Sequence, residues 1–263
     1  MNLHVTPLLR TALLGIPVCL LAGFCVRGPA VSLRQELEAR DPYAHLPAGT
    51  IDAPQSAYLA AVGGFRGVVA DLLWFRSFLA WQEKDAGQQE LLMQAACATD
   101  PYSHDFWSQS AQVLAYDLPW IIQSQEQARS GSAPAPASVK ALRLRYARKA
   151  IGQLDRGLKF RPDDARLASQ KALILLDVLE DPAAALPVLR EAADMPDAPY
   201  FIARIHGETL RRLGRNAEAY GYYKDLFRKL PDDEPEACKE VVFGRIRELE
   251  DELGIPLPQR FRP

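Results

Sequence analysis

The sequence predicts an all-α protein in which two-helix units stack side by side. Two observations support this prediction. Apolar residues recur at helical spacing after residue 60, and prolines that end helical segments recur at a nearly constant interval. The last two intervals are 34 and 35 residues, and the prolines are Pro101, Pro162, Pro196 and Pro231. Because one unit of this length cannot bury its apolar face alone, each is expected to pack against its neighbours.

Residues 5–26 are expected to form a membrane anchor or a signal segment. The run from Thr11 to Val26 carries no charge, and with the preceding residues it reaches the length that a helix needs to cross a bilayer. An uncleaved anchor is favoured, since Pro29 lies beside the scissile bond of the small-x-small site at residues 28–30. N-terminal segments of this kind export the rest of the chain, which predicts a periplasmic body. Residues 27–60 are expected to be a linker.

The helical domain is expected to span residues 61–253 and to begin with a helix over residues 61–85. This segment carries five aromatic residues: Phe65, Trp74, Phe75, Phe78 and Trp81. The plainer interpretation is a first helix that caps the stack. The alternative is a docking surface, since buried aromatic residues dominate interface energetics. Its Gly-Gly-Phe-Arg-Gly stretch followed by Leu-Trp resembles the start of bacterial membrane-anchored repeat proteins.

Small and large side chains fall at matching offsets within the units. Twelve residues before each proline stand Gln89, Ala150, Ala184 and Ala219, and eight residues before stand Met93, Leu154, Val188 and Tyr223. A small residue lets the second helix of a unit lie close to the first, and the larger residue fills the groove between them. These positions are therefore expected to form the contact between the two helices of each unit.

The interval from Pro101 to Pro162 is 61 residues, which exceeds one 34-residue period by 27. Part of this interval, Ser124 to Ser138, is rich in Ser, Ala, Gly and Pro and has nothing to bury. An insertion loop over about residues 117–138 is expected there.

The pattern resembles the tetratricopeptide repeat (TPR) family, whose 34-residue unit places small, large and proline residues at fixed positions. In the last unit the pattern falls on Leu213, Gly214, Ala219, Tyr223 and Pro231. Earlier it falls on Ala172, Leu175, Ala184, Val188 and Pro196, and on Trp107, Ala111, Leu114, Ala150, Leu154 and Pro162. The resemblance covers about four units, from Ala70 to Asp233, and implies an α-solenoid. His206 and Gln89 depart from it, because the family has small residues there.

A helix over residues 234–253 is expected to cap the solenoid at its C-terminal end. Its apolar stripe consists of Val241, Val242, Ile246, Leu249 and Leu253, and charged residues cover its other side. Gly254 and Pro256 end this helix. Residues 254–263 are expected to be a tail.

The TPR resemblance implies a concave groove that is lined by the first helix of each unit and holds a protein or an extended peptide. The groove positions that it assigns are Asp105, Ser108, Gln112, Ala115, Arg166, Ser169, Leu173, Leu176, Tyr200, Ala203, Gly207 and Leu210. The set lacks the lysine and asparagine residues with which some family members clamp a C-terminal carboxylate. Recognition of chaperone tails is therefore not expected.

The formal net charge of −2 gives no reason to expect nucleic acid as a partner. Basic residues nevertheless gather between residues 138 and 161, and five of them form a candidate surface for an anionic partner: Lys140, Arg143, Arg145, Arg148 and Lys149. The alternative is the solvated outer face of a helix whose apolar side is buried.

No catalytic, metal-binding or cofactor-binding motif is present in the sequence. The four histidines share no spacing with carboxylates or cysteines, and there is no Gly-rich phosphate loop. We therefore expect no cofactor and no enzymatic activity. The first hypothesis is a membrane-anchored scaffold or adaptor in a bacterial envelope assembly. The second is an enzyme or small-ligand carrier with a pocket between residues 61–85 and the insertion. The sequence makes no prediction of the oligomeric state.

Overall fold

The computed structural model describes residues 66–263, and the predicted anchor and linker over residues 5–60 lie outside this range. The chain divides into two units after Val68, and the second unit, Val69–Pro263, is the helical domain. The described residues form helices joined by short turns, with no strand among them, so the all-α prediction is confirmed for this part of the chain. No helix between residues 66 and 263 has both the length and the apolar character that a bilayer crossing requires.

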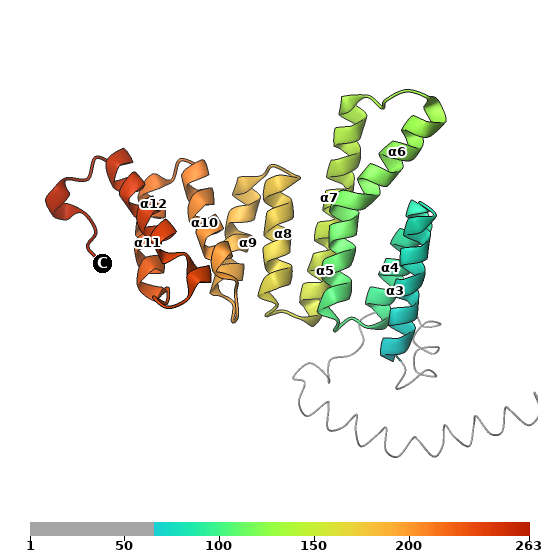
Figure 1. The fold of residues 1–263 in the computed structure, drawn as a ribbon, viewed down its shortest axis with the longest axis horizontal. Helices are drawn as coiled ribbons and strands as arrows, with labels where there is room; N and C mark the ends of the chain where they lie inside the picture. The colour runs from blue at the N-terminus through green and yellow to red at the C-terminus, as the bar shows by residue number, and fades with distance from the viewer. Residues whose placement is uncertain (1–65) are drawn as a thin grey trace, which may run out of the picture. The chain divides into compact units, whose positions relative to one another are not determined.

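Successive helices pair, and the pairs stack side by side in chain order (Figure 1). Short connections make the neighbouring helices antiparallel, as expected for two-helix units. The helices are α3 (Arg66–Gln82), α4 (Ala86–Thr99), α5 (His104–Gln112), η2 (Val113–Asp117), α6 (Leu118–Ser130), α7 (Pro136–Phe160), α8 (Ala165–Asp177), α9 (Pro182–Asp194), α10 (Tyr200–Arg212), α11 (Asn216–Lys229), η3 (Pro235–Ala237), α12 (Lys239–Glu252) and η4 (Leu257–Gln259).

Capping side chains set where several helices begin. The side chains of Asp85, Ser103, Asp164 and Asp181 each accept a hydrogen bond from a backbone N–H three residues later, at the start of α4, α5, α8 and α9. α7 has no such cap and begins with Pro136, whose missing N–H would have no helical partner in the first turn.

The prediction of an insertion loop over residues 117–138 is wrong, because most of this segment is helical. Helices α5, η2 and α6 follow one another without a break from His104 to Ser130, and α7 has 25 residues where α8 has 13. Residues 123–129 consist largely of Gln, Glu, Ala and Arg, whose helix propensity outweighs the effect of the serines. Only residues 131–135 connect α6 to α7. The extra residues lengthen both helices of this hairpin, whose tip extends past its neighbours in Figure 1.

One extra residue in the turn between α8 and α9 shifts the repeat. That turn comprises residues 178–181, whereas residues 213–215 suffice between α10 and α11. In α9 the predicted contact positions, Ala184 and Val188, are therefore only partly buried, and Ala185 and Leu189, one residue later, are fully buried in their place. The predictions for the other second helices are confirmed, since the core contains Met93, Ala150, Leu154, Ala219 and Tyr223.

Two hairpins close through an aromatic ring that rests on a glycine. A methyl group on Gly157 would lie 2.7 Å from Cγ of Trp107, and one on Gly207 would lie 2.4 Å from Cζ of Tyr223. Both rings are buried. Because protein cores are close-packed, any larger residue at either glycine would force the two helices apart. The small residue of this unit is therefore Gly207, one position after His206. His206 does not depart from the repeat, because it does not occupy the small-residue position.

Helix α12 covers the C-terminal end of the stack, as predicted. Val242, Ile246 and Leu249 are fully buried, whereas Val241 and Leu253 of the predicted stripe are exposed. The buried stripe is therefore narrower than the sequence suggested. Val241, at its edge, is exposed at the surface beside α10.

The C-terminal tail folds back onto α11 and α12. Phe261 is buried against Phe227, with 5.5 Å between the ring centroids, and its N–H donates to Oε1 of the fully buried Glu250 at 2.6 Å. Glu250 also accepts hydrogen bonds from Arg247 and Tyr220. Burial alone would raise the pKa of Glu250, but these hydrogen bonds outweigh it and hold the pKa below its usual value. The tail therefore belongs to the folded domain.

Candidate functional site

A groove lies where α5, α8 and α10, the first helices of successive units, meet on one side of the stack. Its main hollow has a volume of about 750 Å³. The turn before α10 and the short helix η3 complete its wall. Six of the residues that the sequence assigned to the groove line this hollow: Ser108, Gln112, Arg166, Ser169, Leu173 and Tyr200.

The other six predicted groove residues lie elsewhere. Three of them, Ala115, Leu176 and Gly207, are buried. Asp105 is exposed at the start of α5, where His104 lines the hollow in its place. Ala203 and Leu210 line a different hollow, between α9 and α11. Residues of α10 differ by about 100° per position, which places this second hollow on the opposite side of that helix.

The shifted repeat explains the error on α10. The predicted groove positions of α10 were counted from Pro196, and this count ends one residue too early. The structure places Phe201 and Arg204 in the groove, next to Tyr200. Sequence reasoning missed both residues. The available signal was Gly207: taking this glycine as the small residue of the unit, in place of His206, would have moved the whole assignment by one residue.

One end of the groove is held by an ionic cluster centred on Asp164. Its Oδ2 lies 2.9 Å from Nδ1 of His104 and 2.8 Å from Nε of Arg161, and its Oδ1 accepts the N–H of Leu167. Burial alone would raise the pKa of Asp164, but the hydrogen bonds from Arg161 and His104 lower it, so the carboxylate stays ionised. The cluster joins the start of α5, the end of α7 and the start of α8.

The groove presents charges of both signs together with apolar side chains. Arg166 is exposed and forms no ion pair with any residue that the structure describes. Arg204 donates to the carbonyl oxygens of Glu236 (3.1 Å) and Ala237 (2.9 Å), so its hydrogen-bond partners carry no charge. Two acidic residues, Asp197 and Glu236, also line the hollow. Such a lining suits a polypeptide, which offers polar backbone groups and mixed side chains.

The groove continues beyond α10 toward α12. Phe201 and Arg204 also line an adjoining hollow of about 270 Å³, together with Val241 and Arg245. Phe201 is 40% exposed and Val241 53% exposed. An open surface with exposed apolar side chains therefore runs from α5 to α12.

The hollow on the opposite side, between α9 and α11, has a volume of about 680 Å³. His206 is one of the residues that line it; this side chain is buried, and its ring centroid lies 4.3 Å from that of Tyr222. Nδ1 of His206 has no hydrogen-bond partner among the described residues. Burial, followed by the nearby charge of Arg190, lowers the pKa of His206, so the imidazole is neutral at pH 7.

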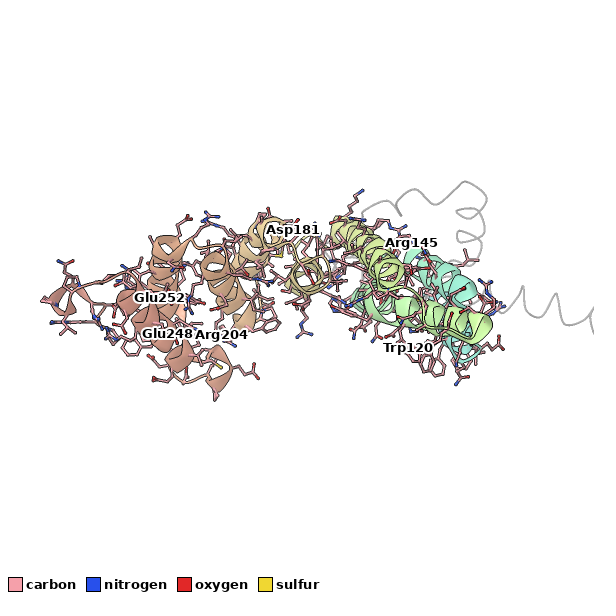
Figure 2. The ribbon with its side chains drawn as sticks, turned by 90° about the horizontal axis from the view of Figure 1, so that it is seen from above. Trp120, Arg145, Asp181, Arg204, Glu248 and Glu252 are labelled. Atoms are coloured by element: carbon pink, nitrogen blue, oxygen red, sulfur yellow. The ribbon has the colours of Figure 1, made fainter. Side chains whose placement is uncertain are left out.

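The five basic residues proposed for an anionic partner do not share one surface. Lys149 pairs with Glu90 of α4 at 2.6 Å, whereas Lys140 and Arg143 line a hollow of about 390 Å³ beside the α8–α9 turn. Arg145 and Arg148 are exposed. Figure 2 shows Arg145 and Asp181 on the side of the stack opposite to Arg204.

The hollow beside the aromatic helix α3 is small. It has a volume of about 220 Å³ and is lined by Trp74, Trp81 and Asp117, among others, which is below the roughly 300 to 1,000 Å³ of most ligand pockets. Burial raises the pKa of Asp117. However, the hydroxyl of Ser77 in the same hollow donates to the carbonyl oxygen of Trp74 at 2.6 Å, and no histidine or cysteine lines this hollow. Within residues 66–263 no three His, Cys, Asp or Glu side chains are grouped to hold a metal ion. These features give no support to the enzyme hypothesis.

Comparisons with known proteins assign no family to this chain. No family model matches the sequence, and no curated protein matches it. Among solved structures, the chain is similar to a thermophilic TPR protein of Thermus thermophilus, at 16% identity and a TM-score of 0.40, over 84% of this chain and 97% of that one. The arrangement described above therefore rests on the contacts within this chain.

Proposed function

We propose that this protein is a scaffold or adaptor that binds a protein partner, as an extended segment, in the groove from α5 to α12. The observation that carries the proposal is this long groove, lined by Arg166, by Arg204 and by the exposed side chain of Phe201. An extended peptide would place side chains against Leu173 and Phe201 while its acidic groups faced the arginines.

The proposal includes a location. We propose that residues 5–26 anchor the protein in a bacterial membrane, that the helical domain is periplasmic, and that the partner belongs to an envelope assembly. The support is the apolar run of residues 11–26, which reaches a spanning length together with the residues before it.

The proposal is tested by measuring the affinity of partners captured with the full chain. Partners are isolated by affinity purification, and their dissociation constants are measured for the wild type and two groove variants. Arg166→Glu reverses a charge that faces the groove, and Phe201→Ala removes an exposed ring. We expect each to weaken binding by about tenfold or more.

Arg190→Glu is the matched control. Arg190 is also exposed, also lacks an ion pair among the described residues, and lines the hollow on the other side of α10. This variant should leave the affinity unchanged. A partner that tolerates Arg166→Glu and Phe201→Ala but is lost with Arg190→Glu would contradict the groove assignment.

A further inference from the structure

Helix α3 exposes an apolar stripe on the side that does not pack against the domain. Ala70, Ser77 and Ala80 are buried, whereas Val68, Leu72, Phe75 and Leu79 are exposed by 64%, 59%, 58% and 41%. At about 100° per residue, the four exposed side chains fall within roughly 60° of one another, on the side of the helix opposite to the buried residues. Four large apolar side chains in one line are unusual for a helix surface that faces water.

The spacing of the stripe is that of a coiled coil. Residues 68, 72, 75 and 79 are separated by steps of four, three and four. In a two-stranded coiled coil, such residues take alternating d and a positions of a heptad and pack as knobs into holes of a second helix. The stripe therefore fits another helix better than a flat surface.

The charges beside the stripe indicate which helix. Asp71 takes the g position before Leu72, and Arg76 takes the e position after Phe75. Neither forms an ion pair with any residue between 66 and 263. They lie about 140° apart on their own helix and cannot pair within it. In a parallel dimer, however, a g residue faces the e residue five positions later in the partner helix, which places Asp71 of each copy opposite Arg76 of the other.

An antiparallel arrangement does not use these charges. There, g positions face g positions of the partner helix, and the other g position of α3 is Phe78. Only the parallel arrangement satisfies both charged residues while it buries the stripe.

We propose that two copies of this chain associate through α3 in a parallel, two-stranded coiled coil held by Val68, Leu72, Phe75 and Leu79. Two symmetric Asp71–Arg76 pairs flank this seam. No residue of α3 lines the groove between α5, α8 and α10, so both grooves of the dimer stay accessible. The dimer presents two binding grooves, and a partner with two binding segments gains avidity.

The first test measures the mass of the full chain in mild detergent by sedimentation equilibrium, for the wild type, Asp71→Arg, Arg76→Asp and the double variant. The wild type should dimerise. Each single substitution should weaken dimerisation about tenfold, because two attractive pairs become two repulsive ones. The double variant should recover the wild-type dissociation constant. Circular dichroism checks that all four proteins keep the same helix content and melting temperature.

The second test determines direction by disulfide trapping in a chain with Cys19, Cys25 and Cys238 replaced by serine. A parallel seam places each position next to itself, so Val68→Cys and Leu79→Cys should each give a covalent dimer on oxidation. In an antiparallel seam position 68 would face position 79, and neither single variant would cross-link.

A wild-type monomer would overturn the proposal, as would a dimer that is insensitive to both charge reversals. A monomer whose binding to phosphatidylglycerol vesicles is abolished by Leu72→Asp would also overturn it and would assign the stripe to a lipid surface.

Discussion

The hairpins α5–α7 and α10–α11 each pack an aromatic ring against a glycine, but the ring and the glycine lie on opposite helices in the two hairpins. In the first, the ring of Trp107 on the leading helix rests on Gly157 of the second helix. In the other, the glycine, Gly207, is on the leading helix and the ring, Tyr223, is on the second. Close packing of a unit therefore requires a large residue opposite a glycine, but the large residue can lie on either of the two helices.

Both rings are also held by a hydrogen bond to the backbone. Nε1 of Trp107 donates to the carbonyl of Pro101 at 2.7 Å, and the hydroxyl of Tyr223 donates to the carbonyl of Arg204 at 3.1 Å. Because each bond fixes the ring, neither ring can turn away from an added methyl group without losing a buried partner. The contact is consequently rigid in both hairpins.

Gly207→Ala is expected to have the largest effect on stability. The added methyl group would lie 2.4 Å from Tyr223, and overpacking of this kind costs about 1 to 3 kcal/mol or somewhat more. After the gain of roughly 1 kcal/mol in helix propensity, we expect a net loss of about 2 kcal/mol in the free energy of unfolding, measured by urea titration. Combining it with Tyr223→Leu should give less than the sum of the two losses. Additive losses would mean that the two residues do not touch.

Glu250→Gln tests how much stability the C-terminal tail adds to the hairpin α10–α11. Among the described residues, no such tail packs against the hairpin α5–α7. Loss of the charged hydrogen bonds from Arg247 and Phe261 should cost about 2 kcal/mol at pH 7. The folded pKa of Glu250 is lowered, so this stability is present above the unfolded pKa and is lost as the pH falls through the folded pKa.

Urea titrations of wild type and Glu250→Gln at pH 7, 5 and 3 check this prediction. The difference between the two proteins should shrink toward pH 3. A difference that is independent of pH would show that the charge of Glu250 does not contribute.

Gly157→Ala should have a smaller effect than Gly207→Ala. Its methyl group would lie 2.7 Å from Trp107. The ring of Trp107 would therefore have to move less than the ring of Tyr223 to remove the clash. We expect a net loss of about 1 kcal/mol in the free energy of unfolding. Hydrogen exchange should show lost protection in α5 and α7 with this variant, but in α10 and α11 with Gly207→Ala. The same pattern for both variants would contradict two separate contacts.

Arg166→Glu and Phe201→Ala should have the smallest effect on stability, below about 0.5 kcal/mol, because both side chains are exposed. Thermal melting measures this. Unchanged melting temperatures would mean that any loss of binding comes from the groove and not from unfolding.

The sequence predicted the helical class and the contacts in α4, α7 and α11, because burial leaves a regular pattern of small and large residues. It mispredicted α9 and the groove positions of α10, because Pro196 comes one residue early relative to the helices around it. The insertion was mispredicted because serine and proline near residues 130–136 obscured good helix formers on both sides. Pairings across the groove, such as Arg204 with the carbonyl oxygens of η3, depend on tertiary packing and leave no local signal.

The groove assignment is tested most directly by site-specific photocross-linking of the full chain in cells. A photoreactive amino acid is placed at Gln112 or Leu173 in the groove, and at Ala183 or Lys229 beside the hollow on the other side. We predict a discrete covalent adduct from both groove positions and none from the other two. Adducts only from Ala183 and Lys229, or none from the groove, would contradict the account.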